Sequence, residues 1–237
     1  MLTQINHWLE IVDTAVDLVL LGRVLTLRLH KTYVYITLAC VLSVMFDGVD
    51  LWLGTDSTPE VRVFLYSRFL YAVLYPLVAW DVFEEVKGQI VKLRRVATGR
   101  LISGLFFATM FCLLLAAFID TGDANGQSTL GSTVGLVLWA GSSSASLAFL
   151  WTLQRGMRAQ NVTVPRNTSV WLAYFELLLA AEVLSCFLLL IPSIKGIGGE
   201  LVNLAYLLYG MAITVWCSIR LRAMPASEEP ASENART

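Results

Sequence analysis

The chain has 237 residues, of which 57% are hydrophobic and 15% are charged, and its formal net charge is −1. Its mean hydropathy of +0.67 separates it from soluble domains, in which about 25% of residues are charged. This composition predicts a polytopic membrane protein without a soluble domain. The sequence contains no recognisable catalytic, cofactor or nucleic-acid motif, and we expect no nucleic-acid partner.

Seven long apolar stretches follow one another along the chain. About 20 helical residues span the hydrocarbon layer of a bilayer, and within lipid only helices and closed barrels satisfy their backbone groups. We therefore predict an all-α, seven-transmembrane, up-and-down helix bundle over residues 1–222, followed by a disordered acidic tail at 223–237. The predicted spans are 7–29, 33–54, 61–83, 100–120, 130–153, 169–192 and 200–220.

The first stretch carries several carboxylates and follows no basic segment. A cleavable signal peptide begins with a basic region and continues as an uninterrupted apolar core. We therefore expect the first stretch to remain as a helix of the bundle.

The basic residues are concentrated in alternate gaps between the apolar stretches. All but three of the 17 Lys and Arg residues lie in every second gap or after the last span, and the exceptions are Arg62, Arg68 and Lys195. Basic residues near helix ends stay on the cytoplasmic side of a membrane. The pattern predicts an amino terminus outside, a carboxyl terminus in the cytoplasm, and a multi-pass protein of the plasma or inner membrane. The residues in the basic gaps are Arg23, Arg28, Lys31, Lys87, Lys92, Arg94, Arg95, Arg100, Arg155, Arg158, Arg166, Arg220, Arg222 and Arg236.

The longest inner connection, residues 84–100, has no proline and keeps apolar residues at intervals. One interpretation is a helical extension of the third span that lies on the membrane surface with its basic face toward anionic lipid. The other is a topology signal without further function. Both interpretations remain open.

An acidic cluster is predicted in the outer half of the bundle. Carboxylates in the first two spans recur at helical spacing, so each set falls on one side of its helix. The third span presents Arg68 and Tyr71 on one face. Counting residues from the outer helix ends places Arg68 at about the depth of Asp47, so we predict an ion pair between them. The carboxylates are Glu10, Asp13, Asp17, Asp47 and Asp50.

One or two arginines do not balance five carboxylates. The remaining acids are solvated at helix ends, protonated, or neutralised by a bound cation. Clustered oxygen ligands suit calcium or another hard cation, and an organic cation fits an outer pocket equally. These alternatives define a cation- or ligand-binding hypothesis for Glu10, Asp13, Asp17, Asp47, Asp50, Arg68 and Tyr71, with the metal unknown.

Glu182 lies near the centre of the sixth span, where an ionisable group is costly and marks a candidate functional position. The residues expected at a similar or slightly more cytoplasmic depth are Ser142, Ser143, Ser144 and Ser146 of the fifth span, Tyr209 of the seventh and Thr109 of the fourth. Glu182 is either a proton-linked switch or a structural hydrogen bond that fixes helix packing. Glu176 lies nearer the inner interface, where it can reach water or Arg166.

Two stripes of small and polar residues predict close helix packing, which small side chains permit in lipid. An oligomer interface is the alternative for these stripes. The stripe on the fifth span is Gly131, Gly135, Trp139, Ser142 and Ser146, and the stripe on the seventh is Asn203, Tyr206, Gly210, Thr214 and Cys217.

We expect no cofactor. The two histidines, His7 and His30, lie at opposite ends of the first span, which excludes bis-histidine haem ligation and a multi-histidine zinc site within the bundle. Helix count and orientation match those of seven-helix receptors and retinal proteins, but the seventh span contains no lysine for a Schiff base. All four cysteines lie in apolar runs, so we predict buried thiols rather than disulfides.

The leading hypothesis is a non-enzymatic seven-helix protein that binds a ligand, a cation or a protein partner. It would act through a membrane or cytoplasmic partner at its basic inner loops, with the lipid bilayer as its environment. The alternative is a proton- or cation-linked small-molecule carrier that uses Glu182 and the outer carboxylates. An intramembrane enzyme ranks third, because no histidine lies in the middle of a span to activate a nucleophile.

Overall fold

The computed structural model describes residues 2–53, 58–87, 99, 103–104, 129–189 and 197–223. Within these residues the chain forms six α-helices and one short 3-10 helix, and no strand. The all-α class is therefore confirmed for the described residues. The helices are α1 (Leu2–Thr26), η1 (Leu29–Lys31), α2 (Val34–Leu53), α3 (Thr58–Val86), α5 (Thr129–Ala159), α6 (Arg166–Leu189) and α7 (Ile197–Arg220).

Six of the seven predicted spans coincide with a described helix. The predicted span at 100–120 lies outside the described residues except for 103–104, and so does the predicted tail at 223–237 except for residue 223. Most of the predicted surface segment at 84–100 also lies outside them. The seven-transmembrane topology of the chain stays a prediction.

Two helix ends differ from the sequence prediction by more than three residues. α1 begins at Leu2, five residues before the predicted start at 7; it stops at Thr26, and Arg28 adopts the left-handed conformation with φ of 55° before η1 begins. α5 continues to Ala159, six residues past the predicted end at 153, and Asn161 follows with φ of 49°. The spans were bounded by hydropathy, but Arg155 and Arg158 do not end α5, because arginine favours a helical backbone.

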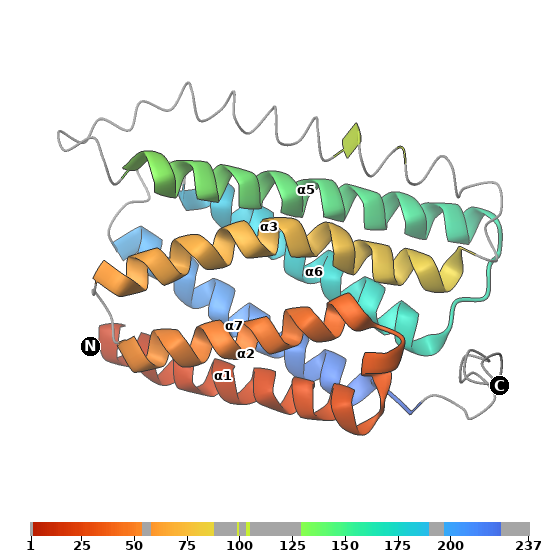
Figure 1. Cartoon of the computed structure of the whole chain (residues 1–237), viewed down its shortest axis with the longest axis horizontal. Helices are drawn as coiled ribbons and strands as arrows, with labels where there is room; N and C mark the ends of the chain where they lie inside the picture. Colours follow the sequence, from red (N-terminus) through yellow and green to blue (C-terminus); the bar gives the residue numbers. More distant parts are fainter. Residues whose placement is uncertain are drawn as a thin grey trace, which may run out of the picture.

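The helices lie side by side in an up-and-down arrangement (Figure 1). α1 contacts α2 and α7, α2 contacts α3, α3 contacts α5, and α5 and α7 both contact α6. These contacts close a ring of six helices, and α3 also contacts α6 across it. We call the end that carries Arg28, Arg158 and Arg220 the basic end, and the end that carries Glu10 and Asp47 the acidic end.

Two helices, α6 and α7, are long and apolar enough to cross a membrane by length and composition. Arg166–Leu188 has a mean hydropathy of 1.7 and Gly198–Arg220 has 1.5. α1 contains Glu10, Asp13, Asp17 and Arg23 within 25 residues. It therefore has too many charged residues to pass the same test of length and composition. The structure by itself thus supports membrane association for α6 and α7.

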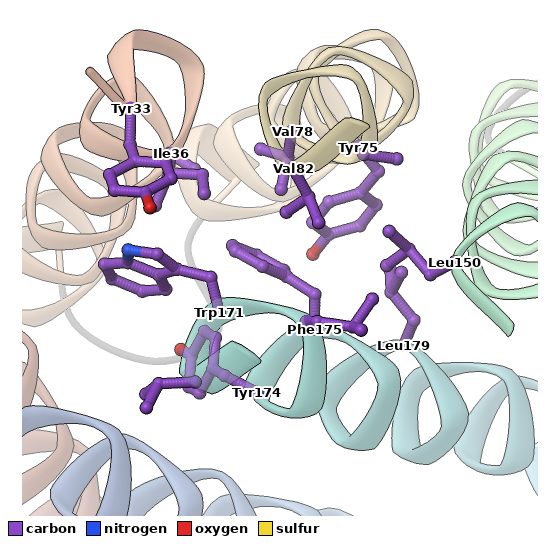
Figure 2. Close-up of a cluster of buried hydrophobic side chains, with 14 of the residues drawn as sticks. Tyr33, Ile36, Tyr75, Val78, Val82, Leu150, Trp171, Tyr174, Phe175 and Leu179 are labelled. Atoms are coloured by element: carbon purple, nitrogen blue, oxygen red, sulfur yellow. The ribbon is translucent and has the colours of Figure 1, made fainter. Parts of the chain in front are cut away.

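The basic half of the bundle has a close-packed core. Trp171 of α6 is fully buried, with its ring centroid 6.3 Å from that of Tyr33, which immediately precedes α2, and 6.0 Å from that of Phe175. Figure 2 shows these rings, with Ile36 beside them, filling the space between α2, α3 and α6. Close packing of large side chains supplies most of the dispersion energy available between helices.

Hydrogen bonds between helices also hold the basic end together. The carboxylate of Asp81, on α3, accepts hydrogen bonds from the backbone N–H groups of Tyr35 and Ile36 at distances of 2.6 and 3.0 Å. These N–H groups belong to the first turn of α2 and have no partner within their own helix. Asp81 therefore acts as an N-terminal cap supplied by a neighbouring helix.

A reciprocal pair joins α6 to the end of α7. The backbone N–H of Arg222 donates to Oδ1 of Asn167 at 3.0 Å, and Nδ2 of Asn167 donates to the carbonyl of Arg222 at 2.8 Å. One residue earlier, the carbonyl of Leu221 accepts from the Arg23 guanidinium at 3.0 Å. The end of α7 is thereby tied to both of its neighbouring helices.

The small-residue stripe of α5 faces into the bundle where its side chains are described. Trp139, Ser142 and Ser146 are all buried, and the hydroxyl of Ser142 donates to the carbonyl of Ala72 on α3. A serine that bonds to a neighbouring backbone permits the close approach of α3 and α5. This part of the stripe packs within the chain.

Candidate functional site

A cavity of about 390 Å³ lies inside the ring of helices and extends from the acidic end toward the middle of the bundle. Its lining residues come from α1, α2, α3, α6 and α7. The polar and aromatic residues among them are Glu10, Asp13, Thr14, Asp17, Ser43, Phe46, Asp47, Ser67, Arg68, Tyr71, Tyr75, Tyr174, Phe175, Glu182, Asn203, Tyr206 and Thr214.

The predicted carboxylates of α1 all line this cavity. Asp13 lies close enough to Glu10 and Asp17 for their like charges to repel. Deeper in the cavity, the hydroxyl of Ser43 on α2 donates to Oδ2 of Asp17 at 2.5 Å. The acidic stripes of α1 and α2 therefore face each other across one space, as their spacing on the two helices predicts.

Asp47 and Arg68 line the same cavity, on α2 and α3 respectively. The guanidinium carbon of Arg68 lies 3.8 Å from the centroid of the Trp139 ring on α5. Stacking on an aromatic face stabilises a guanidinium that is withdrawn from water. The direct pairing of Asp47 with Arg68 stays a prediction, and the side chain of Asp50 lies outside the described residues.

Glu182 also lines this cavity, and it is almost completely buried, with 2% of its surface exposed. Its Oε1 accepts hydrogen bonds from the hydroxyls of Tyr75 and Tyr206, and its Oε2 accepts one from Ser143 at 2.8 Å. These donors come from α3, α7 and α5. Because each donor lies on a different helix, the carboxyl group of Glu182 on α6 joins four helices at one point.

Of the residues expected at the depth of Glu182, Ser143 bonds to it, but Ser142 and Tyr209 do not. Ser142 bonds to the backbone of α3, and Tyr209 is 38% exposed on the outside of α7. The residues that reach Glu182 are Tyr75, Ser143 and Tyr206. Depth along a helix follows from counting residues, but one residue turns a side chain by about 100° around the axis, and helix rotation depends on packing.

Glu176 has a partner other than the predicted water or Arg166. The side-chain amide of Gln154 on α5 donates to its Oε2 at 3.2 Å. Glu176 does not line the cavity. It is therefore a carboxylate of the same helix that is independent of the candidate site.

An aromatic wall runs along one side of the cavity. The ring centroids of Phe46 and Tyr71 are 6.0 Å apart, and those of Tyr71 and Tyr75 are 5.5 Å apart in a stacked arrangement. All three residues line the cavity. The wall leads from the acidic end to Tyr75, which donates to Glu182, and its π-faces suit both apolar groups and cations.

The α7 stripe contributes to the site as well as to packing. Asn203, Tyr206, Gly210 and Thr214 all line the cavity, and the hydroxyls of Thr214 and Tyr174 are hydrogen bonded at 3.3 Å. The sequence signal for these residues was their helical spacing, which predicts close packing and a polar cavity face equally. Whether these residues of α7 pack closely against a helix or line a cavity depends on where α6 and α1 lie beside α7.

The cavity does not form a metal centre in the described part of the chain. No group of three or more His, Cys, Asp or Glu side chains there is close enough to hold one metal ion. The carboxylates are spread along the cavity instead of converging on a point. The hypothesis of a calcium-type site made by the outer carboxylates is therefore not supported by their geometry.

No known protein-family model, curated protein or solved structure matches the chain.

Proposed function

We propose that this protein is a seven-helix integral membrane protein, with its amino terminus outside and its basic end in the cytoplasm. Each described α-helix has at least 20 residues, enough for a bilayer at 1.5 Å per residue. α1, α5 and α7 carry Arg23, Arg158 and Arg220 in their last turns. These three helix ends lie at one end of the bundle. That arrangement suits the retention of basic residues on the cytoplasmic side.

The distribution of polarity supports the same proposal. Large apolar side chains cover the outside of the helices; examples are Val19 (62% exposed), Leu184 (60%) and Ile219 (69%). Carboxylates and hydroxyls point into the bundle, and Glu182 and Ser143 are buried. An exposed apolar surface of this extent is costly in water, whereas lipid solvates it. Plasma or inner membrane is the corresponding location.

We propose that the cavity binds a small organic cation that enters from the outer side. The observation that carries this proposal is the lining of the cavity: five carboxyl groups stand against one guanidinium, that of Arg68. A cation balances this excess of acidic groups, and the neighbouring aromatic faces add cation–π attraction. A volume of about 390 Å³ lies within the range of small-molecule sites.

Binding without catalysis is the simpler use of this site. No histidine lines the cavity among the described residues, and histidine is the usual base that activates a serine. The hydroxyls of Ser43 and Ser143 donate to carboxylates. A sensor with such a site would pass its signal to a protein partner at the basic end.

The binding proposal is tested by isothermal titration calorimetry of the full chain in nanodiscs against organic amines and matched neutral alcohols. Amines should bind and alcohols of the same shape should not. Asp17→Asn should weaken amine binding by about tenfold, because it removes a charge-assisted contact. Glu176→Gln is the matched control, since it removes a carboxylate outside the cavity, and it should leave binding unchanged.

The pH dependence gives a second, independent measurement of the same proposal. A carboxyl group attracts an ammonium ion only when it is ionised, so protons and ligand compete for the same oxygens. Affinity should therefore rise with pH and fall in acidic buffer, as long as the amine stays protonated. A pH-independent affinity, or equal binding of the neutral alcohol, would contradict cation binding.

A carrier is the second candidate, and one observation favours it. Glu182 lies in a cavity that extends from the acidic end, while the core around Trp171 closes the basic end. This is the shape of an outward-facing carrier in which Glu182 couples ligand to a proton. Glu182→Gln in proteoliposomes should abolish pH-driven amine uptake while preserving the folded protein. Binding without any uptake by the unaltered protein would instead identify a sensor.

A further inference from the structure

We propose that the ligand is an extended polyamine, in which two or more ammonium groups are joined by methylene chains. This inference rests on the cation-binding function proposed above and names the chemical class of that cation. It depends on how the carboxylates are spaced and on the aromatic residues that line the same cavity.

The carboxylates of α1 form a ladder along the cavity. Glu10, Asp13 and Asp17 all line it, and at 1.5 Å per residue they are displaced along the axis by about 4.5 Å and then about 6 Å. Ammonium groups separated by three or four methylenes repeat at a comparable interval. A linear polyamine can therefore place one ammonium group beside each successive carboxylate.

The same spacing disfavours compact cations. No three carboxylates in the described part of the chain converge on one point, so a single metal ion cannot compensate them together. A monoamine compensates one carboxylate and leaves Asp13 exposed to the repulsion of a charged neighbour, because Asp13 interacts with both Glu10 and Asp17. A single cation with its charge distributed along the cavity compensates all three carboxylates of the ladder at once.

The aromatic lining of the cavity suits the methylene segments. Phe46, Tyr71 and Tyr75 form a continuous wall with centroid separations of 6.0 and 5.5 Å. Burial of each methylene group from water contributes favourable free energy, and the aromatic faces also attract the neighbouring charges. The cavity thus combines an acidic ladder on α1 with an apolar and aromatic wall on α2 and α3.

Asp17 is the innermost ammonium position. Both carboxylate oxygens of Glu182 already accept hydrogen bonds from protein hydroxyls. Asp17 is oriented by Ser43 through Oδ2 and lies deeper than Asp13 and Glu10. The first ammonium group therefore binds at Asp17, and the following groups bind at Asp13 and Glu10 toward the opening.

The test is a titration series with butylamine, putrescine and spermidine, which carry one, two and three ammonium groups. Calorimetry with the full chain in nanodiscs should show affinity rising by about tenfold with each added charge-assisted contact. Asp13→Asn should weaken putrescine and spermidine while leaving butylamine unchanged, because butylamine contacts Asp17. Glu176→Gln should change none of the three affinities.

The outcomes distinguish a failure of the polyamine inference from a failure of the proposed cation-binding function. If the three amines bind equally, or if Asp13→Asn weakens all of them alike, the polyamine class is wrong and cation binding stands. If no amine binds the unaltered protein, the cation-binding function is wrong as well. Circular dichroism of each variant in the same nanodiscs verifies that it is folded.

Discussion

At the basic end the side chains of Tyr33, Trp171 and Leu221 are completely buried, whereas at the acidic end five helices surround a cavity. The two ends use polar groups differently. Asp81 and Asn167 satisfy backbone groups of neighbouring helices, while Glu10, Asp13 and Asp17 line open space. The comparison shows that the basic end is closed by packing and hydrogen bonds between helices, whereas the acidic end encloses a cavity, which is the space that the proposed ligand requires.

This division has an energetic cost at the acidic end. Carboxylates of like charge repel one another, and a cavity lacks the dispersion contacts of a packed core. Proteins commonly retain sites of this kind at a cost in stability, because their function requires such sites. Substitutions at the two ends should therefore change stability in opposite directions.

The largest expected effect is at the core of the basic end. Trp171→Ala should lower the free energy of unfolding by about 3 to 5 kcal/mol, as expected for the loss of a large buried aromatic side chain. Trp151→Ala is the matched control, because Trp151 is 50% exposed and stacks mainly on Arg155 at 3.8 Å. Its loss should cost about 1 kcal/mol or less.

Thermal unfolding of both variants in detergent, followed by circular dichroism, makes this comparison. Equal losses at positions 171 and 151 would show that the core around Trp171 does not hold the basic end together.

A smaller effect is expected at the cap of α2. Asp81→Ala removes the acceptor for the N–H groups of Tyr35 and Ile36 and should cost about 1 to 3 kcal/mol. Asp81→Asn keeps an oxygen acceptor and should cost less. Hydrogen exchange at the two N–H groups should speed up in the alanine variant, and unchanged protection there would rule out the capping role.

The smallest effect is expected at the acidic end and has the opposite sign. Asp13→Asn relieves repulsion from Glu10 and Asp17, so without ligand it should raise stability by about 0.5 to 1 kcal/mol. Asp17→Asn should give less, because it also weakens the contact with Ser43. Denaturation of the ligand-free variants measures both values, and a clear loss of stability in Asp13→Asn would mean that the cavity carboxylates serve the fold.

Part of the site could be predicted from the sequence. Glu10, Asp13, Asp17, Asp47, Arg68 and Tyr71 were grouped by helical spacing, and all of them line the cavity. The period of a helix places side chains on one face without any knowledge of neighbours. The hairpin of α1 and α2 follows from the short connection, which forces the two acidic stripes into proximity.

The other part could not be predicted. Glu182 was treated as separate from the acidic cluster, yet it lies in the same cavity. Its partners are Tyr75, Ser143 and Tyr206, and only Ser143 was among the residues expected at its depth. Choosing between adjacent residues of a helix requires its rotation about its own axis. That rotation is set by side-chain packing against two or three other helices, which no local pattern contains.

The sequence by itself determined the helical class of the described residues, six helix positions to within six residues, and which carboxylates share one side of a helix, because hydropathy and the 3.6-residue period are local properties. The tertiary structure decided that α1 closes the ring against α7 and that α3 contacts α6. These contacts place Glu182 and the carboxylates of α1 around one cavity. They depend on the shapes of side chains far apart in the chain, so they exist only once the helices have packed.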